Sequence, residues 1–108
     1  MNYTLIPDLA TQEIPADGIL SRTLYADDQV KVVLFAFSVG QELSEHTAST
    51  PAIIQIVKGE ARLTLGSDTI EARAGTWVYM PAQLTHSLQA RTPLIMLLVL
   101  LKAPAGAK

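Results

Sequence analysis

Cysteine is absent from this chain, and its basic residues are few and never grouped. Without cysteine there can be no disulfide framework and no thiolate metal site. The 8 lysines and arginines stand singly in a chain of formal net charge −2, so no basic stripe is available for nucleic acid or an anionic membrane. We therefore expect neither nucleic acid nor membrane among its partners.

Targeting signals and long apolar runs are also missing. The first residues, "MNYTLIPDLA", lack the basic stretch followed by an apolar stretch that marks a secretory signal peptide. The longest apolar run is "LIMLLVLL" (94–101), which as a helix would rise about 12 Å against a hydrocarbon core of roughly 30 Å. The run predicts a buried strand or a buried helix, and we expect a cytoplasmic protein.

Glycine and proline interrupt the chain every few residues and decide between helix and strand. They divide it into segments that are mostly too short for a stable helix. The segments are rich in β-branched and aromatic residues, a composition typical of strands. We predict strands at "ILSRTLY", "VKVVLFAFSV", "AIIQIVK", "ARLTL", "TIEAR", "TWVYM" and "LIMLLVLL".

Alternation within these segments predicts which side chains are buried. The stretch "ARLTLGSDTIEA" predicts a hairpin around a Gly-Ser-Asp turn. "VVLFAF" and "LIMLLVLL" are apolar on both faces, so each needs a second layer to cover it. In the hairpin we expect Ala61, Leu63, Leu65, Ile70 and Ala72 inside and Arg62, Thr64, Thr69 and Glu71 outside.

Many short strands at this spacing are typical of an all-β antiparallel sandwich or barrel, of which the jelly roll is one form. A chain of 108 residues is long enough for one core and too short for two. We place the domain at residues 13–102, with a loose segment at 1–12 and a loose tail at 103–108.

The chain has only 2 histidines, and each follows a glycine in a short segment of regular spacing. Five residues separate Gly40 from His46, and five separate Gly75 from Pro81, with His86 shortly after. A small barrel has room inside for one ligand, and polar groups are expected to converge at its mouth. If His46 faces inward, strand alternation places Glu42, Ser44 and Ala48 on its face, and Leu88 and Ala90 on the face of His86.

These spacings make the chain similar to a small single-domain cupin, over roughly residues 30–101. The first cupin motif is Gly-x5-His-x-His-x3-4-Glu/Gln-x6-Gly, and the second is Gly-x5-Pro-x-Gly-x2-His-x3-Asn. The anchors present here are Gly40, His46, Gly59, Gly75, Pro81 and His86. The resemblance implies an antiparallel double-stranded β-helix, that is, a jelly-roll barrel.

The departures from the two motifs are as informative as the matches. Ala48 replaces the second histidine, Ala52 the acidic or amide ligand, and Ala90 the final asparagine, while Gln83 replaces the glycine of the second motif. Of the four usual metal ligands of the family, His46 and His86 remain, which implies at most a weakly held divalent transition metal. Gln55, Tyr79, Glu42 and Gln89 are the nearest residues in sequence that could complete its coordination. Simple alternation turns Gln55 to the opposite face, unless a bulge after Pro51 reverses this.

The alanines also indicate another use of the barrel. They remove charge and bulk, so we expect a larger and more apolar cavity with the two histidines as its convergent polar groups. Without a metal, one histidine could act as general acid or base while the other donates a hydrogen bond, which makes His46 and His86 the candidate catalytic residues. The candidate ligand-binding residues are His46, Ala48, Ala52, Gln55, Tyr79, His86 and Ala90.

Two classes of function follow, and we favour the first. One is a cupin that binds a small molecule in the barrel and has an eroded metal site. The other is a metal-dependent dioxygenase, isomerase or decarboxylase that uses both histidines and a ligand outside the family pattern. A purely structural role would predict a filled barrel without a cavity.

The resemblance also implies a homodimer in which N-terminal strands pair across the interface. Ile19, Leu20, Leu24 and Tyr25 are the candidate interface residues. The alternative is that the N-terminal strands of the same chain cover the apolar sheet.

Overall fold

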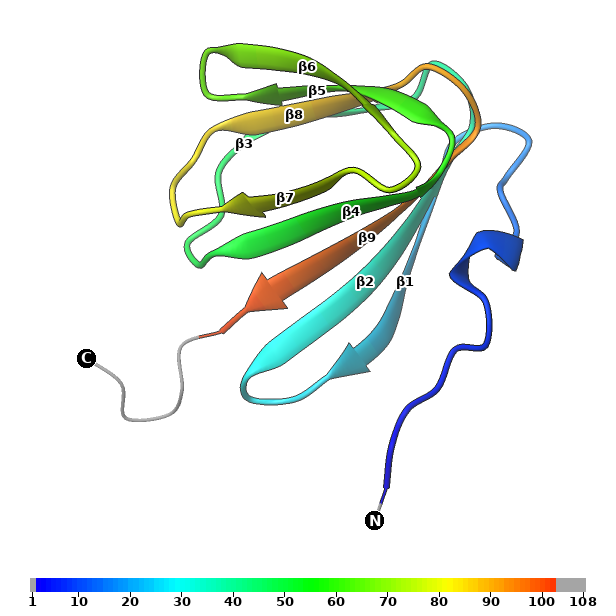
Figure 1. Ribbon diagram of the computed structural model, residues 1–108, viewed down its shortest axis with the longest axis vertical. Helices are drawn as coiled ribbons and strands as arrows, with labels where there is room; N and C mark the ends of the chain where they lie inside the picture. The colour runs from blue at the N-terminus through cyan, green and yellow to red at the C-terminus, as the bar shows by residue number, and fades with distance from the viewer. Residues whose placement is uncertain (1, 103–108) are drawn as a thin grey trace.

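Two antiparallel sheets face each other in the computed structural model, which describes residues 2–102 (Figure 1). The first sheet has the order β1-β2-β9-β4-β7, with β1 (Ile19–Ala26), β2 (Val30–Phe37), β9 (Leu94–Leu101), β4 (Ala52–Lys58) and β7 (Trp77–Met80). The second has the order β3-β8-β5-β6, with β3 (Glu42–His46), β8 (His86–Ala90), β5 (Glu60–Leu65) and β6 (Asp68–Arg73). The predicted all-β jelly roll is confirmed.

The main core lies between the two sheets and is built by alternation along each strand. On β2 and β9 one face contributes Phe37, Leu94 and Met96, each at most 1% exposed. β5 and β8 contribute Leu63 and Leu88 from the opposite sheet. Burying a large apolar side chain of this kind stabilises a fold by about 1.5–3 kcal/mol, so these strands are held together mainly by the contact between their inner faces.

The outer face of the five-stranded sheet carries a second, smaller core. Leu34, Ala36 and Ile95 are buried there, and Leu9 and Ile14 of the N-terminal segment pack against them. The prediction that β2 and β9 need cover on both faces is therefore confirmed. Within the segment expected to be loose, the chain forms one turn of 3-10 helix, η1 (Leu9–Thr11), while residues 103–108 lie outside the described part of the chain.

The predicted hairpin of β5 and β6 forms, but Asp68, which was expected in the turn, is the first residue of β6 and pairs with Leu65. Ala61 pairs with Ala72 and Leu63 with Ile70, and two residues, Gly66 and Ser67, form the turn. Ile70 is 37% exposed because β6 is the edge of its sheet, and it is the exception to the predicted burial. Among residues 2–102 the structure contains no helix of sufficient length and apolar character to cross a membrane.

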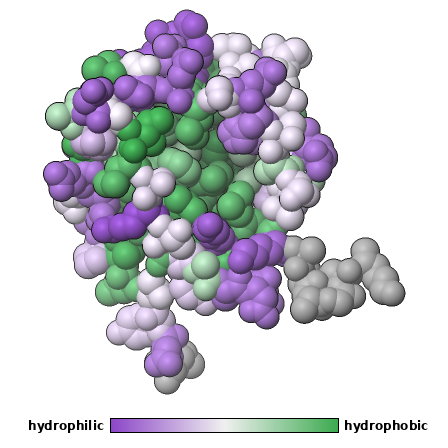
Figure 2. All heavy atoms as spheres, turned by 180° about the vertical axis from the view of Figure 1, so that it is seen from behind, coloured by the Kyte–Doolittle hydropathy of each residue, from purple (hydrophilic) through white to green (hydrophobic). Residues whose placement is uncertain are grey.

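Seen from behind, apolar side chains gather in a hollow in the middle of the molecule, and hydrophilic residues surround them (Figure 2). The edges of this surface are therefore well solvated, while its centre exposes apolar groups. Single exposed apolar residues are common on protein surfaces, whereas a continuous group of them is less so.

Gly59 joins β4 to β5 and therefore links the two sheets. Its φ is +91°, and a Cβ added there would collide with the backbone carbonyl oxygen of Pro93. Gly75 has a similar φ of +97°, but a Cβ there would meet nothing within 4 Å. A comparison of the two positions therefore separates the effect of backbone strain from the effect of a steric collision.

We predict that Gly59→Ala destabilises the fold much more than Gly75→Ala. Gly75→Ala adds only the strain of a non-glycine residue at positive φ, about 1–3 kcal/mol. Gly59→Ala adds to that strain a clash with backbone that cannot move without shifting β9. Urea unfolding of the two variants checks this, and equal losses of stability would contradict the close approach at Gly59.

Candidate functional site

His46 and His86 lie side by side at one end of the four-stranded sheet. His46 is the last residue of β3 and His86 the first of β8, and the two are paired in the strand register. Their ring centroids are 4.2 Å apart and the rings are tilted by 58°. His86 is 8% exposed, whereas His46 is exposed at the mouth of the barrel. The structure therefore brings together the two residues that the sequence singled out.

A β-bulge in β3 is the reason that both rings are on the same side. Leu43 pairs with Leu88, but the next paired residues are His46 and His86, so β3 has one more residue than β8 over this interval. Strict alternation would turn His46 away from the face of Leu43, and the extra residue turns it back. The expectation that Glu42 and Ser44 share the face of His46 is wrong for this reason, because Leu43 packs against the core in their place.

Each imidazole is held by its own backbone in the same way. Nδ1 of His46 lies 2.8 Å from the carbonyl oxygen of Ser44, and Nδ1 of His86 lies 2.9 Å from that of Leu84. A carbonyl oxygen only accepts hydrogen bonds, so both Nδ1 atoms carry the proton and donate it. In the neutral ring the proton is then absent from Nε2, and each histidine presents a lone pair there. The same arrangement orients histidines that bind metals in proteins.

The cavity beside the two rings is small. Its volume is about 20 Å³, which is room for about one water molecule. The expectation of a larger cavity is therefore wrong, because aliphatic side chains fill the space. The residues that line it are Leu43, His46, Ile54, His86, Ser87, Leu88, Met96 and Leu98.

The three alanines lie in three different places. Ala48 is in the loop after β3, and its carbonyl oxygen accepts a hydrogen bond from the backbone N–H of Gln83 at 2.8 Å. Ala52 is 2% exposed in the main core. Ala90 shares the inner face with His86 and Leu88, as predicted, but lies four residues further along β8, about 13 Å away at the usual rise of a strand. None of the three lines the cavity at the histidines.

Gln83, which stands where the second cupin motif has a glycine, has a backbone conformation that favours glycine. Its φ is 69°, in the left-handed region, and it is the one non-glycine residue with positive φ within residues 2–102. Holding a side chain there costs roughly 1–2 kcal/mol. The hydrogen bond to Ala48 shows what this conformation does, since it ties the loop before His86 to the loop after His46.

The four residues expected to complete a metal site all point away from it. Gln55 is exposed on the outer face of β4, where it pairs with Trp77, so the simple alternation that turned Gln55 outward holds. Tyr79 is 50% exposed on the same outer face of β7. Glu42 and Gln89 pair with each other and line a separate, polar groove on the outer face of the four-stranded sheet.

That outer face is a network of paired charges. Arg91 donates a hydrogen bond to Glu71 at 3.1 Å, and Nε of Arg62 lies 3.5 Å from the same carboxylate. The hydrogen bond from Arg91 lowers the pKa of the Glu71 carboxyl below its ordinary value, with a smaller contribution from Arg62. These side chains are exposed, so the network contributes little to stability and is best described as a solvated surface.

The donors present do not fit the divalent metal site that the resemblance implies. Among the described residues, no group of three or more His, Cys, Asp or Glu could hold a metal ion. A catalytic zinc site takes three protein ligands and a water, and a non-haem iron site takes two histidines and a carboxylate. Two imidazoles without a carboxylate leave a divalent ion under-coordinated and its charge uncompensated.

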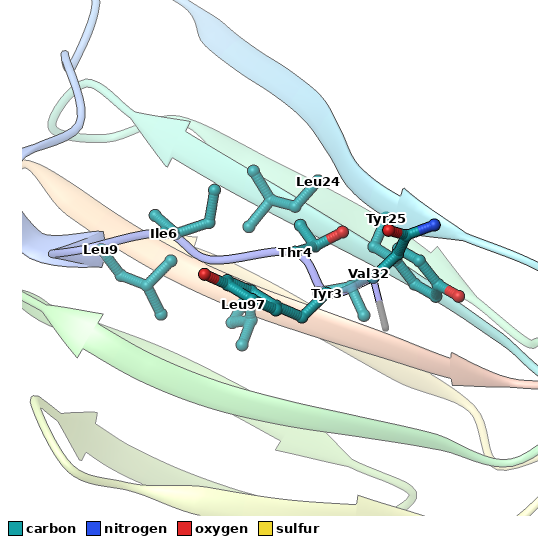
Figure 3. Close-up of a pocket in the computed structure, with 9 residues that line it drawn as sticks. Tyr3, Thr4, Ile6, Leu9, Leu24, Tyr25, Val32 and Leu97 are labelled. Carbon is teal, nitrogen blue, oxygen red and sulfur yellow. The ribbon is translucent and has the colours of Figure 1, made fainter.

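A much larger cavity lies elsewhere, on the outer face of the five-stranded sheet. It is an open groove of about 540 Å³ beneath the N-terminal segment. Figure 3 shows this segment crossing the sheet, with Tyr3 over Leu97 and Ile6 near Leu24. The sequence does not predict this groove, because residues 2–9 have no periodic pattern of apolar side chains.

Comparison with known proteins identifies a family for the sequence and similar folds among solved structures. The sequence model of the family described as "Cupin domain" matches residues 33–100. A conserved protein of unknown function from Streptococcus pyogenes is 31% identical, with a TM-score of 0.83 over 95% of this chain and 91% of that one. A cupin superfamily protein from Desulfitobacterium hafniense is 26% identical, with a TM-score of 0.83 over 91% and 90%. KdgF from Halomonas sp., 19% identical with a TM-score of 0.73 over 85% and 86%, shares the fold. No protein with curated annotation matches the chain.

Proposed function

The chain belongs to the cupin family, and we propose that it binds one small ligand through Nε2 of His46 and Nε2 of His86, without a resident divalent metal. The observation that carries this proposal is the pair of hydrogen bonds from Nδ1 to backbone carbonyls. They leave two lone pairs beside one cavity, and a ligand that meets them must supply a hydrogen-bond donor or accept an electron pair.

The size of the cavity limits what enters it. About 20 Å³ admits one hydroxyl, one amine or one ion, and the rest of a larger molecule would remain outside. The exposed ring of His46 and the loop at Gln83 would then form the remaining contacts. The surroundings are apolar apart from the histidines and Ser87, as in most small-molecule sites, where a few polar groups determine orientation.

A metal-dependent enzyme is the second candidate. The retained spacing of His46 and His86 favours it, and so does their attachment to carbonyls. The outward direction of Gln55, Tyr79, Glu42 and Gln89 opposes it, since each could contribute only after a rearrangement of its strand. We therefore favour the ligand-binding function.

We expect at least one compound from a panel of small sugars, hydroxy acids and amides to bind wild-type protein and to fail with the double variant His46→Ala, His86→Ala. At one hundred times its Kd, such a compound stabilises the folded protein by about 2.7 kcal/mol. Thermal unfolding with each compound measures this directly. Gln55→Ala is the matched control, because its side chain lies on the opposite face of the barrel wall and its loss leaves binding unchanged.

Two results would contradict this function. One is a set of measurements in which neither a compound nor a monovalent ion distinguishes wild type from the double variant. The other is elemental analysis of untagged protein that finds about one zinc, iron, manganese or nickel per chain, lost in the double variant, which would favour the enzyme.

We further propose that the chain forms a homodimer through the outer face of its five-stranded sheet. Tyr3 is 83% exposed and Leu5 69% exposed on the N-terminal segment, although both are large apolar residues. Leu24, Val32 and Leu97 line the groove beside them. A second copy of the chain would cover both the exposed N-terminal side chains and the groove, because a twofold interface presents the same patch from each chain.

The dimer is expected to weaken when the N-terminal apolar residues are replaced. Tyr3→Ser with Leu5→Ser removes apolar contact area from the proposed interface and leaves the main core intact. Size-exclusion chromatography with light scattering is expected to show about twice 11.6 kDa for wild type and a shift toward 11.6 kDa for the variant. Val39→Ser, at a residue 61% exposed in the turn after β2, is the control. A monomeric wild type would refute the interface.

A further inference from the structure

A third electron-pair donor lines the cavity at the two histidines. Met96 lies on β9, in the sheet opposite His46 and His86, and its side chain is 1% exposed. The alternation along β9 directs Met96 to the inner face together with Leu94 and Leu98, which pack in the same core. One cavity is thus lined by two imidazoles from one sheet and one thioether from the other.

These three donors are all neutral. Among the described residues that line the cavity, none carries a carboxylate, and the others are aliphatic side chains apart from Ser87. A divalent ion placed there would keep its full double charge in apolar surroundings, which is strongly unfavourable. A monovalent ion carries half that charge.

The volume of the cavity also limits the coordination number. About 20 Å³ holds an ion and little else. Hard ions such as Mg²⁺ keep several waters when the protein supplies few ligands, and Ca²⁺ takes six to eight oxygens. An ion that enters this cavity must be satisfied by the nitrogen and sulfur donors of the protein.

We propose that the cavity binds a single Cu(I) ion through Nε2 of His46, Nε2 of His86 and Sδ of Met96. Cu(I) is monovalent and soft, and thioether ligands select it over harder ions, while imidazole suits copper as well. This inference rests on the proposed function, because it uses the same pair of histidines and names the class of ligand that they bind. The loss of the carboxylate and of the second histidine of the family pattern is then a change of metal preference.

The test is a titration of the full-length protein with Cu(I) under anaerobic conditions, in competition with a chromogenic Cu(I) chelator. We expect one Cu(I) per chain in wild type and none in the double variant His46→Ala, His86→Ala. Met96→Leu keeps the shape of the side chain and removes the sulfur, and we expect it to weaken Cu(I) binding by at least about tenfold, the scale on which even outer-shell changes act. Met80→Leu is the control, because Met80 is 2% exposed in the same core and does not line the cavity.

A second readout reports contact with the sulfur itself. With the methionine methyl groups labelled with ¹³C, Cu(I) is expected to shift the Met96 signal and to leave the Met80 signal in place. Urea unfolding of the Met96→Leu and Met80→Leu proteins establishes that both are folded, since exchange of Met for Leu in a core usually costs less than about 1.5 kcal/mol.

The outcomes separate this inference from the function on which it rests. If Cu(I) does not compete with the chelator, or binds wild type and Met96→Leu equally, the copper site is refuted. The proposed function survives that result when an organic compound still distinguishes wild type from the double histidine variant. If Zn(II) binds at one ion per chain more tightly than Cu(I), the preference for a soft monovalent ion is refuted. If neither copper nor any compound distinguishes the two proteins, both proposals are refuted.

Discussion

One extra residue in β3 places His46 beside His86 at the mouth of this barrel. Between Leu43 and His46 the strand has one residue more than its partner β8, so Leu43 and His46 both face the interior. Without that residue the alternation of the strand would direct one of them to solvent. The bulge therefore allows one short strand to direct both the core residue Leu43 and the histidine His46 inward. It also places the imidazole of His46 beside that of His86, with ring centroids 4.2 Å apart.

The backbone then orients the two imidazole rings. Each Nδ1–H donates to a carbonyl two residues earlier, so no second side chain is needed to orient the rings. The two backbone carbonyls are therefore sufficient to orient both rings. The loss of the other family ligands did not enlarge the barrel, because Ile54, Met96 and Leu98 of the opposite sheet occupy the space between the layers. What remains is a cavity of atomic size with an unusual set of neutral donors.

Much of this could be predicted from the sequence, because it depends on local alternation and on turn residues. The hairpin of β5 and β6, the two-sided burial of β2 and β9 and the inward direction of Leu88 and Ala90 all follow from a period of two. The bulge could not be predicted, because "LSEH" contains no glycine or other residue that marks one. The position of Ala90 along β8 could not be predicted either. Ala90 shares the face of His86 but lies at the opposite end of the strand. The position of Met96 beside the two histidines depends on packing between the sheets, which no local pattern reveals.

The most direct test of this account is the protonation of the two imidazoles at neutral pH. Long-range ¹H–¹⁵N correlation spectra of the histidine rings distinguish a proton on Nδ1 from a proton on Nε2. We predict that both neutral rings carry the proton on Nδ1 and leave Nε2 unprotonated. A proton on Nε2 in either ring would mean that the carbonyl of Ser44 or Leu84 does not hold it, and the paired lone pairs on which the site depends would not exist.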